Sequence, residues 1–298
     1  MGKLVWAQQF GRARVAIIHE GGGWWSLERA LADVPPDLAR AAGVSLNDRA
    51  QLWIDFNLVH VSLPGASLLL DTGFGEVDPR DPTRPLVSVQ GIQLSDGRDA
   101  ALAALGISPA DITHVLITHL HGDHIAGATR LVGGQRRPAF PNARYYATAR
   151  EWESAPEFHQ RADVIAAQKE ALQAAGVIEL VAEEREIVPG VQLIPAPGES
   201  PGHAIVRIDT GADIVYYLGD LFHQPAEFAH LDWIPRFRDR ETLVAVRRHL
   251  VPRFAAEDAW LIPAHHAFPA IGKVRAAASG YLWEPLEETA ERRRSGGH

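Results

Sequence analysis

Three histidines and one aspartate lie within six residues of this chain, in the segment His-Leu-His-Gly-Asp-His at positions 119–124. The apolar, β-branched run over residues 112–118 that precedes it is typical of a buried strand. In an extended segment, side chains two residues apart point the same way, so His119 and His121 are expected to face one spot. The aspartate and the third histidine then turn back towards the same region. Imidazole and carboxylate groups gathered in this way favour zinc and neighbouring transition metals.

A lone histidine is most often a surface residue or a hydrogen-bonded core residue, and this interpretation suits most of the 14 histidines in the chain. It does not suit four potential ligands clustered at one strand end. The pattern His-x-His-x-Asp-His resembles the signature of the metallo-β-lactamase superfamily, and residues 111–127 resemble that superfamily over their whole length. We therefore expect further ligands downstream.

Later motifs extend the resemblance. The segment 200–203, Ser-Pro-Gly-His, resembles the superfamily's Pro-Gly-His motif, and residues 214–220 read as a buried strand that ends in Gly-Asp. Residues 261–266 are a short apolar run that ends in two histidines. Upstream, residues 67–73 resemble the Asp-Thr-Gly strand that braces the site in the family. Each later motif is weak alone, but their order and spacing are specific, and the resemblance spans about residues 57–284.

The resemblance implies seven ligands for two divalent metal ions, zinc in the first place, with manganese, iron and cobalt as alternatives. Three ligands belong to one metal, three belong to the other and one carboxylate bridges both: His119, His121 and His203; Asp123, His124 and His265; and Asp220. Of the two adjacent histidines at the last motif, the family pattern favours His265, and His266 remains an alternative. Many relatives carry a histidine where this chain has Glu199, a position that is not usually a ligand, so this departure is expected to cost little.

Two metals about 3.5–4 Å apart can share a hydroxide at neutral pH and stabilise an oxygen that gains negative charge. This chemistry suits hydrolysis at a carbonyl or phosphoryl group. The chain has no cysteine, which excludes a thiol nucleophile and a cysteine ligand. The expected catalytic residues are Asp123, Asp220 and His223. His223 follows Asp220 by three residues, where quorum-signal lactonases of the superfamily carry a tyrosine; it either contacts the substrate oxygen or orients a ligand.

We therefore expect a dinuclear metal-dependent hydrolase that acts on a small, fairly apolar ester or lactone through hydroxide held by the metals. The segments 264–272 and 275–285 resemble the branch that contains methyl parathion hydrolase. Phosphotriester or phosphodiester hydrolysis is the alternative within hydrolases. In another class, the alternatives are a mononuclear iron oxygenase of the persulfide type, or a binding module that has kept the fold.

The resemblance implies one metallo-β-lactamase-like domain over residues 1–298, an αββα sandwich of the α/β (α+β) class. The pattern predicts strands over 15–19 and 53–63, separated by the glycines at 21–23, and helices over 26–32, 99–105, 158–175 and 242–254. Trp24 and Trp25 are expected either at a substrate mouth or in packing. Phe222, Phe228 and Trp233 form either an apolar pocket or core.

Composition limits the partners. The net charge of −8 weighs against a nucleic-acid surface. The N-terminus has no long apolar stretch, so neither a signal peptide nor a membrane span is expected. The absence of cysteine is compatible with the cytoplasm. We expect a small-molecule substrate as the partner, and a homodimer remains an open alternative.

Overall fold

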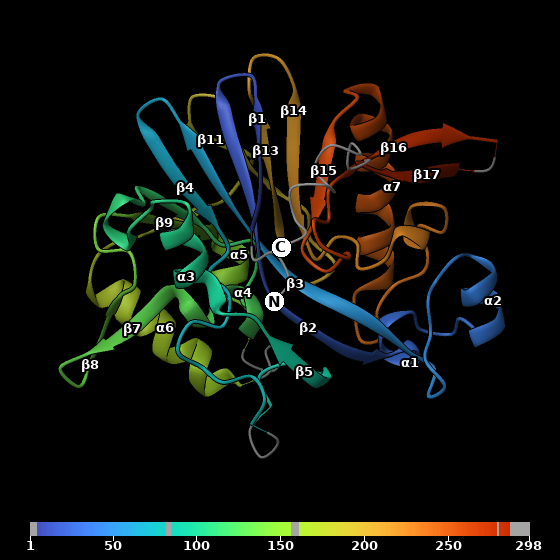
Figure 1. The fold of residues 1–298 in the computed structure, drawn as a ribbon, viewed down its shortest axis with the longest axis horizontal. Coiled ribbons are helices and arrows are strands. Elements are labelled where there is room, and N and C mark those ends of the chain that lie inside the picture. Colours follow the sequence, from blue (N-terminus) through green and yellow to red (C-terminus); the bar gives the residue numbers. More distant parts are fainter. Residues whose placement is uncertain (1–4, 82–84, 156–160, 279, 287–298) are drawn as a thin grey trace, which may run out of the picture.

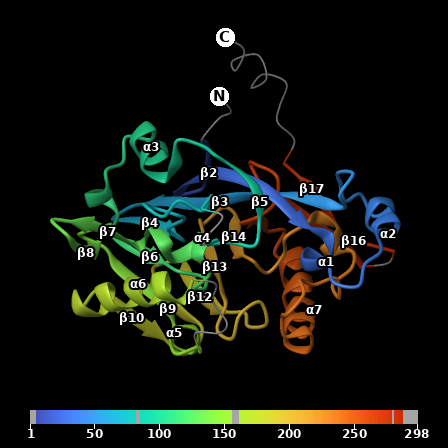
Figure 2. The same cartoon turned by 90° about the horizontal axis from the view of Figure 1, so that it is seen from below.

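Two β-sheets pack face to face in the computed structural model, and helices cover the outer face of each sheet (Figures 1 and 2). The structure describes residues 5–81, 85–155, 161–278 and 280–286. The expected αββα sandwich is confirmed.

The first sheet runs in the order β1-β2-β3-β4-β6-β9-β10, and β5 pairs with β2. Its strands are β1 (Val5–Phe10), β2 (Ala13–Ser26), β3 (Gln51–Leu63), β4 (Ala66–Leu70), β5 (Gln90–Leu94), β6 (His114–Leu116), β9 (Arg144–Thr148) and β10 (Ile178–Val181). The pairs β4·β6, β6·β9 and β9·β10 are parallel, whereas the neighbouring pairs β1·β2, β2·β3 and β3·β4 are antiparallel.

The second sheet runs in sequence order from β11 to β17. Its strands are β11 (Arg185–Val188), β12 (Val191–Pro195), β13 (Ala204–Asp209), β14 (Ile214–Gly219), β15 (Trp260–Pro263), β16 (Gly272–Ala277) and β17 (Gly280–Pro285). Only β14 and β15 pair in parallel, with α7 between them in the chain. A separate two-stranded hairpin consists of β7 (Thr129–Val132) and β8 (Gln135–Pro138).

The helices differ greatly in length. They are α1 (Leu27–Ala30), α2 (Pro36–Ala41), α3 (Gly97–Ala104), α4 (Gly122–Ile125), α5 (Ala149–Trp152), α6 (Ala162–Ala174) and α7 (Arg240–Ala256), with 3₁₀ turns η1 (Pro109–Asp111), η2 (Ala126–Ala128) and η4 (Pro225–Phe228). No helix in the described ranges is long and apolar enough to cross a membrane.

Neighbouring residues of one strand enter different layers of the core. Ile17 of β2 packs between the two sheets, where it meets Val206 and Tyr217, whereas Ile18 packs against the helices outside the first sheet. The same alternation in the second sheet directs Tyr216 towards α7. This is the period of two expected of strands buried on both faces.

Some expected elements differ from the structure. The glycines at 21–23 do not separate two elements, because β2 runs through them to Ser26. A Cβ at Gly21 would meet the backbone oxygen of Gln93 on β5, so the close approach of β5 explains the glycine. The helix expected over 26–32 has only the four residues of α1. The apolar run 112–118 is a strand only over its three central residues.

The remaining helices agree more closely. The expected helix 99–105 corresponds to α3, and the expected helix 242–254 corresponds to the longer α7, which contains Pro252. The helix expected from residue 158 begins at Ala162 in the structure, and residues 158–160 lie outside the described part of the chain.

Candidate active site

All seven predicted ligands lie at one end of the two sheets, each near a strand end. His203 directly precedes β13, and its ring centroid lies 5.1 Å from that of His119. His119 and His121 follow β6, and α4, which begins at the next residue, carries Asp123 and His124. The other two, Asp220 and His265, follow the parallel neighbours β14 and β15. Carboxyl ends of parallel strands lie at one edge of a sheet, which places Asp220 beside His265.

Asp220 lies at the centre of this group. Its Oδ1 is 3.0 Å from Nε2 of His124 and 3.0 Å from Nε2 of His265. Its Oδ2 is 3.6 Å from Nε2 of His119 and 3.4 Å from Nε2 of His223. The carboxylate of Asp123 completes the arrangement, 3.6 Å from His124 and 3.5 Å from His265. We call the following six residues the floor of the site: His119, His121, Asp123, His124, Asp220 and His265.

The floor has the donors of a divalent metal centre. Nε2 of His124 and Oδ1 of Asp220 are fully buried and have no hydrogen-bond partner, although they are only 3.0 Å apart. Buried polar atoms without partners are costly in a folded protein unless an ion satisfies them. Three sets of donor atoms each lie within 4.8 Å of one another: Asp123 with His124 and His265, Asp220 with His119 and His121, and Asp220 with His223 and His265. All three sets consist of the nitrogen and oxygen donors that zinc and related ions bind.

Glu199 joins the second of these sets, and His203 does not. Oε1 of Glu199 lies 3.8 Å from Nδ1 of His121, and the glutamate side chain is fully buried. Nε2 of His203 instead accepts a hydrogen bond of 3.1 Å from the backbone N–H of Asp220. From the sequence, Glu199 is only a departure from the family pattern that is expected to cost little, so its place beside the floor is a finding of the structure. The ligand role of His203 stays a prediction.

The close approach of the histidine loop explains one glycine. Gly219 has a φ of +50°, and a Cβ there would lie 2.8 Å from Nε2 of His203 and 3.0 Å from Thr118. Any larger residue would combine backbone strain with a clash. The Gly-Asp sequence that ends β14 therefore allows Asp220 to turn into the floor.

Asp71, directly after β4, supports the floor through hydrogen bonds. It accepts hydrogen bonds from the backbone and the hydroxyl of Thr118, at 2.7 and 2.9 Å, and from the hydroxyl of Tyr217 at 2.8 Å. Its Oδ2 also lies 2.7 Å from Nδ1 of His124. A carboxylate on Nδ1 fixes the ring so that Nε2 faces the metal position. The bracing expected of the Asp-Thr-Gly segment is present.

Backbone oxygens orient two other rings in the same way. Nδ1 of His265 lies 2.8 Å from the carbonyl oxygen of Asp55, and Nδ1 of His203 lies 3.1 Å from that of Ala196. In both rings Nδ1 therefore donates, so Nε2 carries the lone pair in His203 and becomes a lone-pair donor in His265 once that ring has lost its proton. By contrast, neither ring nitrogen of His266 has a hydrogen-bond partner, and its ring packs against Phe228 and Trp283.

A buried glutamate on α5 ties two histidine loops together. Glu151 accepts hydrogen bonds from the backbone N–H of Leu120 at 3.0 Å, the hydroxyl of Ser200 at 2.7 Å and the backbone N–H of Gly202 at 2.8 Å. Leu120 lies between two floor histidines, and Gly202 precedes His203. Sequence reasoning missed Glu151, because the spacing Thr148-x-x-Glu151 signals only a helix start.

A second buried carboxylate holds the loop after Asp220. Glu227 accepts hydrogen bonds from the backbone N–H groups of His223 and Gln224, at 2.9 and 2.7 Å, and pairs with Arg247 of α7 at 2.5 Å. Arg247 also donates to the backbone oxygens of Leu221 and Trp233. Since both charged side chains are completely buried, the loop has little freedom to move.

The protonation of the floor follows from its burial and its charges. Burial, with the neighbouring charges of His124 and His121, holds the pKa of His119 well below its ordinary value. Burial alone would lower the pKa of His265, but the carboxylates of Asp220 and Asp123 raise it to about 9. A metal that binds His265 must therefore displace a proton, which makes metal affinity depend on pH.

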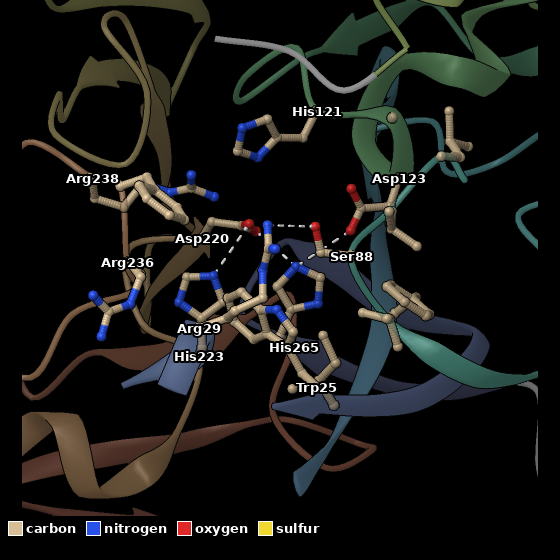
Figure 3. A pocket seen from close by; sticks show the side chains of 17 residues that line it. Trp25, Arg29, Ser88, His121, Asp123, Asp220, His223, Arg236, Arg238 and His265 are labelled. Atoms are coloured by element: carbon tan, nitrogen blue, oxygen red, sulfur yellow. Dashed lines mark hydrogen bonds and ion pairs between the residues drawn. The ribbon is translucent and has the colours of Figure 1, made fainter. Parts of the chain in front are cut away.

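The floor opens into a pocket whose other walls are apolar and cationic (Figure 3). His223 lines it, stacked on His265 at 5.4 Å between ring centroids and next to Trp25 at 5.2 Å. We call the outer part of the pocket, formed by Arg29, Ser88, Arg236, Phe237 and Arg238, the mouth.

The aromatic residues considered from the sequence divide between pocket and core. Trp25 lines the pocket, and Trp24 packs edge-on against Trp53. Phe222 and Phe228 are fully buried in the cluster under α7, where they pack as core.

The sequence profile of the metallo-beta-lactamase superfamily matches residues 58–265, more than half of the chain. Among curated proteins, an N-acyl homoserine lactonase of Bacillus cereus is 32% identical over 115 residues, which cover 37% of this chain and 38% of the relative. A probable metallo-hydrolase of Mycobacterium tuberculosis is 30% identical over 183 residues, which cover 52% of this chain and 53% of the relative. The chain thus spans about half or less of the length of these relatives.

Solved structures match over nearly the whole chain. AidC, described as a dizinc quorum-quenching lactonase, has a TM-score of 0.79 at 21% identity and covers 96% of this chain, with 98% of its own length matched. AbOPH, described as a hydrolase in the beta lactamase superfamily, has a TM-score of 0.78 at 20% identity, and the match covers 97% of this chain and 99% of the AbOPH chain. These likenesses establish the fold. The profile match over residues 58–265 shows that this chain belongs to the metallo-β-lactamase superfamily.

Proposed function

We propose that the protein is a dinuclear metal-dependent hydrolase of a small ester or lactone. One observation supports it above all. Buried nitrogen and oxygen atoms of His124, His265 and Asp220 converge, and two of them, Nε2 of His124 and Oδ1 of Asp220, have no hydrogen-bond partner. The predicted ligands His119, His121, Asp123, His124, His203, Asp220 and His265 would hold the two ions, with Asp220 between them. Zinc is the first choice, and manganese, iron and cobalt are alternatives.

Two bound divalent ions supply a nucleophile from water at neutral pH and withdraw charge from the oxygen of a scissile carbonyl. The protein's own part is to hold the donors rigidly and to exclude bulk water. The donors are held by buried hydrogen bonds from the loops that carry the floor to Asp71, Glu151 and the Glu227–Arg247 pair. Bulk water is excluded by the apolar walls at Trp25 and Phe56.

His223 is the residue best placed to act on the substrate. Its Nε2 lies 3.4 Å from Oδ2 of Asp220, its Nδ1 has no hydrogen-bond partner, and the residue lines the pocket. Burial lowers its pKa to about 4, against the opposing effect of Asp220, so the ring is neutral at pH 7. A neutral imidazole carries one N–H, and when this group is not bonded to Asp220 it can donate a hydrogen bond to a carbonyl oxygen that gains charge.

The choice of an ester or lactone is supported by the relatives. Several curated relatives are N-acyl homoserine lactonases, and AidC is described with an N-acyl homoserine product. A carbonyl substrate also suits the single neutral donor at His223. Phosphotriester hydrolysis and mononuclear iron oxygenation are the outcomes against which the proposal is tested.

The test is a substrate panel on protein from which metal has been removed by chelation and then restored. The panel contains short-chain N-acyl homoserine lactones, simple γ-lactones, aryl esters and aryl phosphotriesters. We expect hydrolysis of a lactone or an ester to disappear with the metal and to return with zinc or manganese. We expect His265→Ala to abolish this activity, and His249→Ala, a change of an exposed histidine on α7, to leave it intact.

Three results would contradict the proposal. Hydrolysis that survives chelation would exclude a metal-dependent reaction. A preference for phosphotriesters over every lactone and carboxylic ester would give the alternative substrate class. Oxygen consumption with one iron per chain would indicate the oxygenase.

A further inference from the structure

The mouth of the pocket is built from two segments that are far apart in the sequence. The backbone N–H of Arg236 donates to the carbonyl oxygen of Arg29 at 2.7 Å, and that of Ala32 donates to Ile234 at 2.9 Å. These hydrogen bonds fix the end of α1 against the segment that precedes α7. As a result, Arg29 and Arg236 line the same pocket (Figure 3).

Arg29 has spare binding capacity. Its guanidinium donates to the hydroxyl of Ser88 at 3.0 Å and lies 5.9 Å from the centroid of the Phe237 ring. Within residues 5–81, 85–155, 161–278 and 280–286 it forms no ion pair with a carboxylate. A guanidinium has five N–H donors, so most of those of Arg29 remain available to an anion.

The other two arginines of the mouth differ in how firmly they are paired. Arg238 is bonded to the buried Glu199 at 2.5 Å, and this pair is part of the wall. Arg236 lies 3.6 Å from Glu28 and 3.5 Å from Asp33, whose side chains are 78% and 82% exposed. Nε of Arg236 also donates to the backbone oxygen of Glu28 at 3.3 Å. Exposed ion pairs of this kind contribute little and exchange easily, so the terminal N–H groups of Arg236 can also turn to a ligand.

The lining of the pocket is less acidic than the molecule as a whole, because it contains three arginines and two aspartates. The chain has a net charge of −8, yet the carboxylates that line the pocket, Asp123 and Asp220, both belong to the floor. The mouth presents guanidinium groups beside the apolar side chains of Val87, Val89 and Phe237. A cationic rim around a concave, partly apolar site attracts an anionic ligand selectively.

We propose that the substrate carries an anionic oxygen group, a carboxylate or a phosphate, which Arg29 and Arg236 bind at the mouth while the ester or lactone group lies on the floor. This inference rests on the proposed function and specifies its substrate class. The cavity volume is about 110 Å³, which suits a compact molecule that spans floor and mouth together. Guanidinium groups match planar carboxylates and phosphates in geometry as well as in charge.

The first experiment compares two lactones of the same shape. One is a γ-lactone with a carboxylate on a short side chain, and the other carries a primary amide in its place. We expect kcat/KM to be about tenfold higher for the carboxylate, the value of one good charge-assisted hydrogen bond. The preference should shrink as salt is added, because exposed charges are screened. A third lactone with a phosphate group distinguishes the two anions.

The second experiment assigns the preference to the mouth. In Arg29→Gln with Arg236→Gln, the carboxylate-to-amide ratio of kcat/KM should fall to about one, whereas Arg29→Lys should retain part of it. Arg137→Gln is the matched control, an exposed arginine on β8 that does not line this pocket. Binding of tetrahydrofuran carboxylate and its carboxamide, which lack the scissile carbonyl, is measured by calorimetry on the same variants.

The outcomes separate this inference from the proposed function. Equal turnover of the charged and neutral lactones overturns the anionic substrate class and leaves the hydrolase. A preference that survives loss of both arginines also overturns it. If no lactone is hydrolysed but the carboxylate binds in a way that depends on Arg29, the result supports the anion site and counts against the hydrolase. Absence of both turnover and such binding overturns both.

Discussion

The floor and the mouth of the pocket are made in different ways. The floor lies at strand ends, and its central residues are almost completely buried: His119 at 0%, Asp220 at 3% and His265 at 3% exposed. The mouth lies on a four-residue helix and an irregular segment, and its Phe237 is 79% exposed. Two packed sheets fix the floor, whereas a few backbone hydrogen bonds hold the mouth.

This difference separates chemistry from selectivity. Rigid, buried donors are what a metal centre needs, since misplacement of a ligand weakens the metal site. Exposed loops tolerate change, so they can alter the substrate without disturbing the chemistry. Substitutions in the floor and around it should therefore affect turnover or metal binding, and substitutions in the mouth should affect the choice among substrates.

His223 lies between the two regions and, after the predicted metal ligands, gives the largest expected effect on turnover. In His223→Ala we expect kcat to fall about a hundredfold, the usual loss for one donor to a developing oxyanion. Metal content should be unchanged, because the loop is held by Glu227 and Arg247 rather than by the ring. Turnover and metal content are measured together, with metal in excess and then limiting.

A different result would reassign His223. If excess metal restores full turnover, the ring orients a ligand and does not contact the substrate. His249→Ala serves again as the control for loss of a histidine elsewhere.

Glu151 tests whether the support beneath the floor matters as much as the ligands. In Glu151→Gln, one oxygen that accepts hydrogen bonds becomes an NH₂ group, and the loops at Leu120 and Gly202 lose part of their common anchor. We expect metal affinity to weaken by roughly ten- to a hundredfold, as for other residues that orient ligands. Turnover at saturating metal should change much less, because Glu151 does not line the pocket.

Metal affinity is measured by competition with a chromogenic chelator. Glu153→Gln is the matched control, since Glu153 follows Glu151 closely and is exposed. Equal metal affinity in the two variants would show that Glu151 is only part of the core.

The sequence predicts the floor much better than the mouth. His119, His121, Asp123 and His124 are close in the chain, so local spacing alone brings them together. The order of the later motifs predicts Asp220 and His265, because each follows a recognisable apolar run. His203 remains open: it lies beside the floor, but its Nε2 accepts from the N–H of Asp220.

The mouth and the supporting carboxylates arise from contacts that no local pattern encodes. Arg29 and Arg236 meet through a backbone hydrogen bond between segments about two hundred residues apart. Glu151 gives a helix-start signal, yet its side chain reaches Leu120 and Ser200 on two other loops. In the same way, the glycines at 21–23 resemble a turn in sequence, and only the approach of β5 explains them as part of β2.

The most direct test of the central claim is the metal content of the purified protein. Metal analysis by mass spectrometry, on protein prepared without chelator and on Asp220→Ala, counts the ions that the floor holds. A dinuclear centre bridged by Asp220 predicts about two divalent ions per chain in the native protein and a clear loss in the variant. Saturation at one ion per chain, or two ions retained after Asp220→Ala, would contradict it.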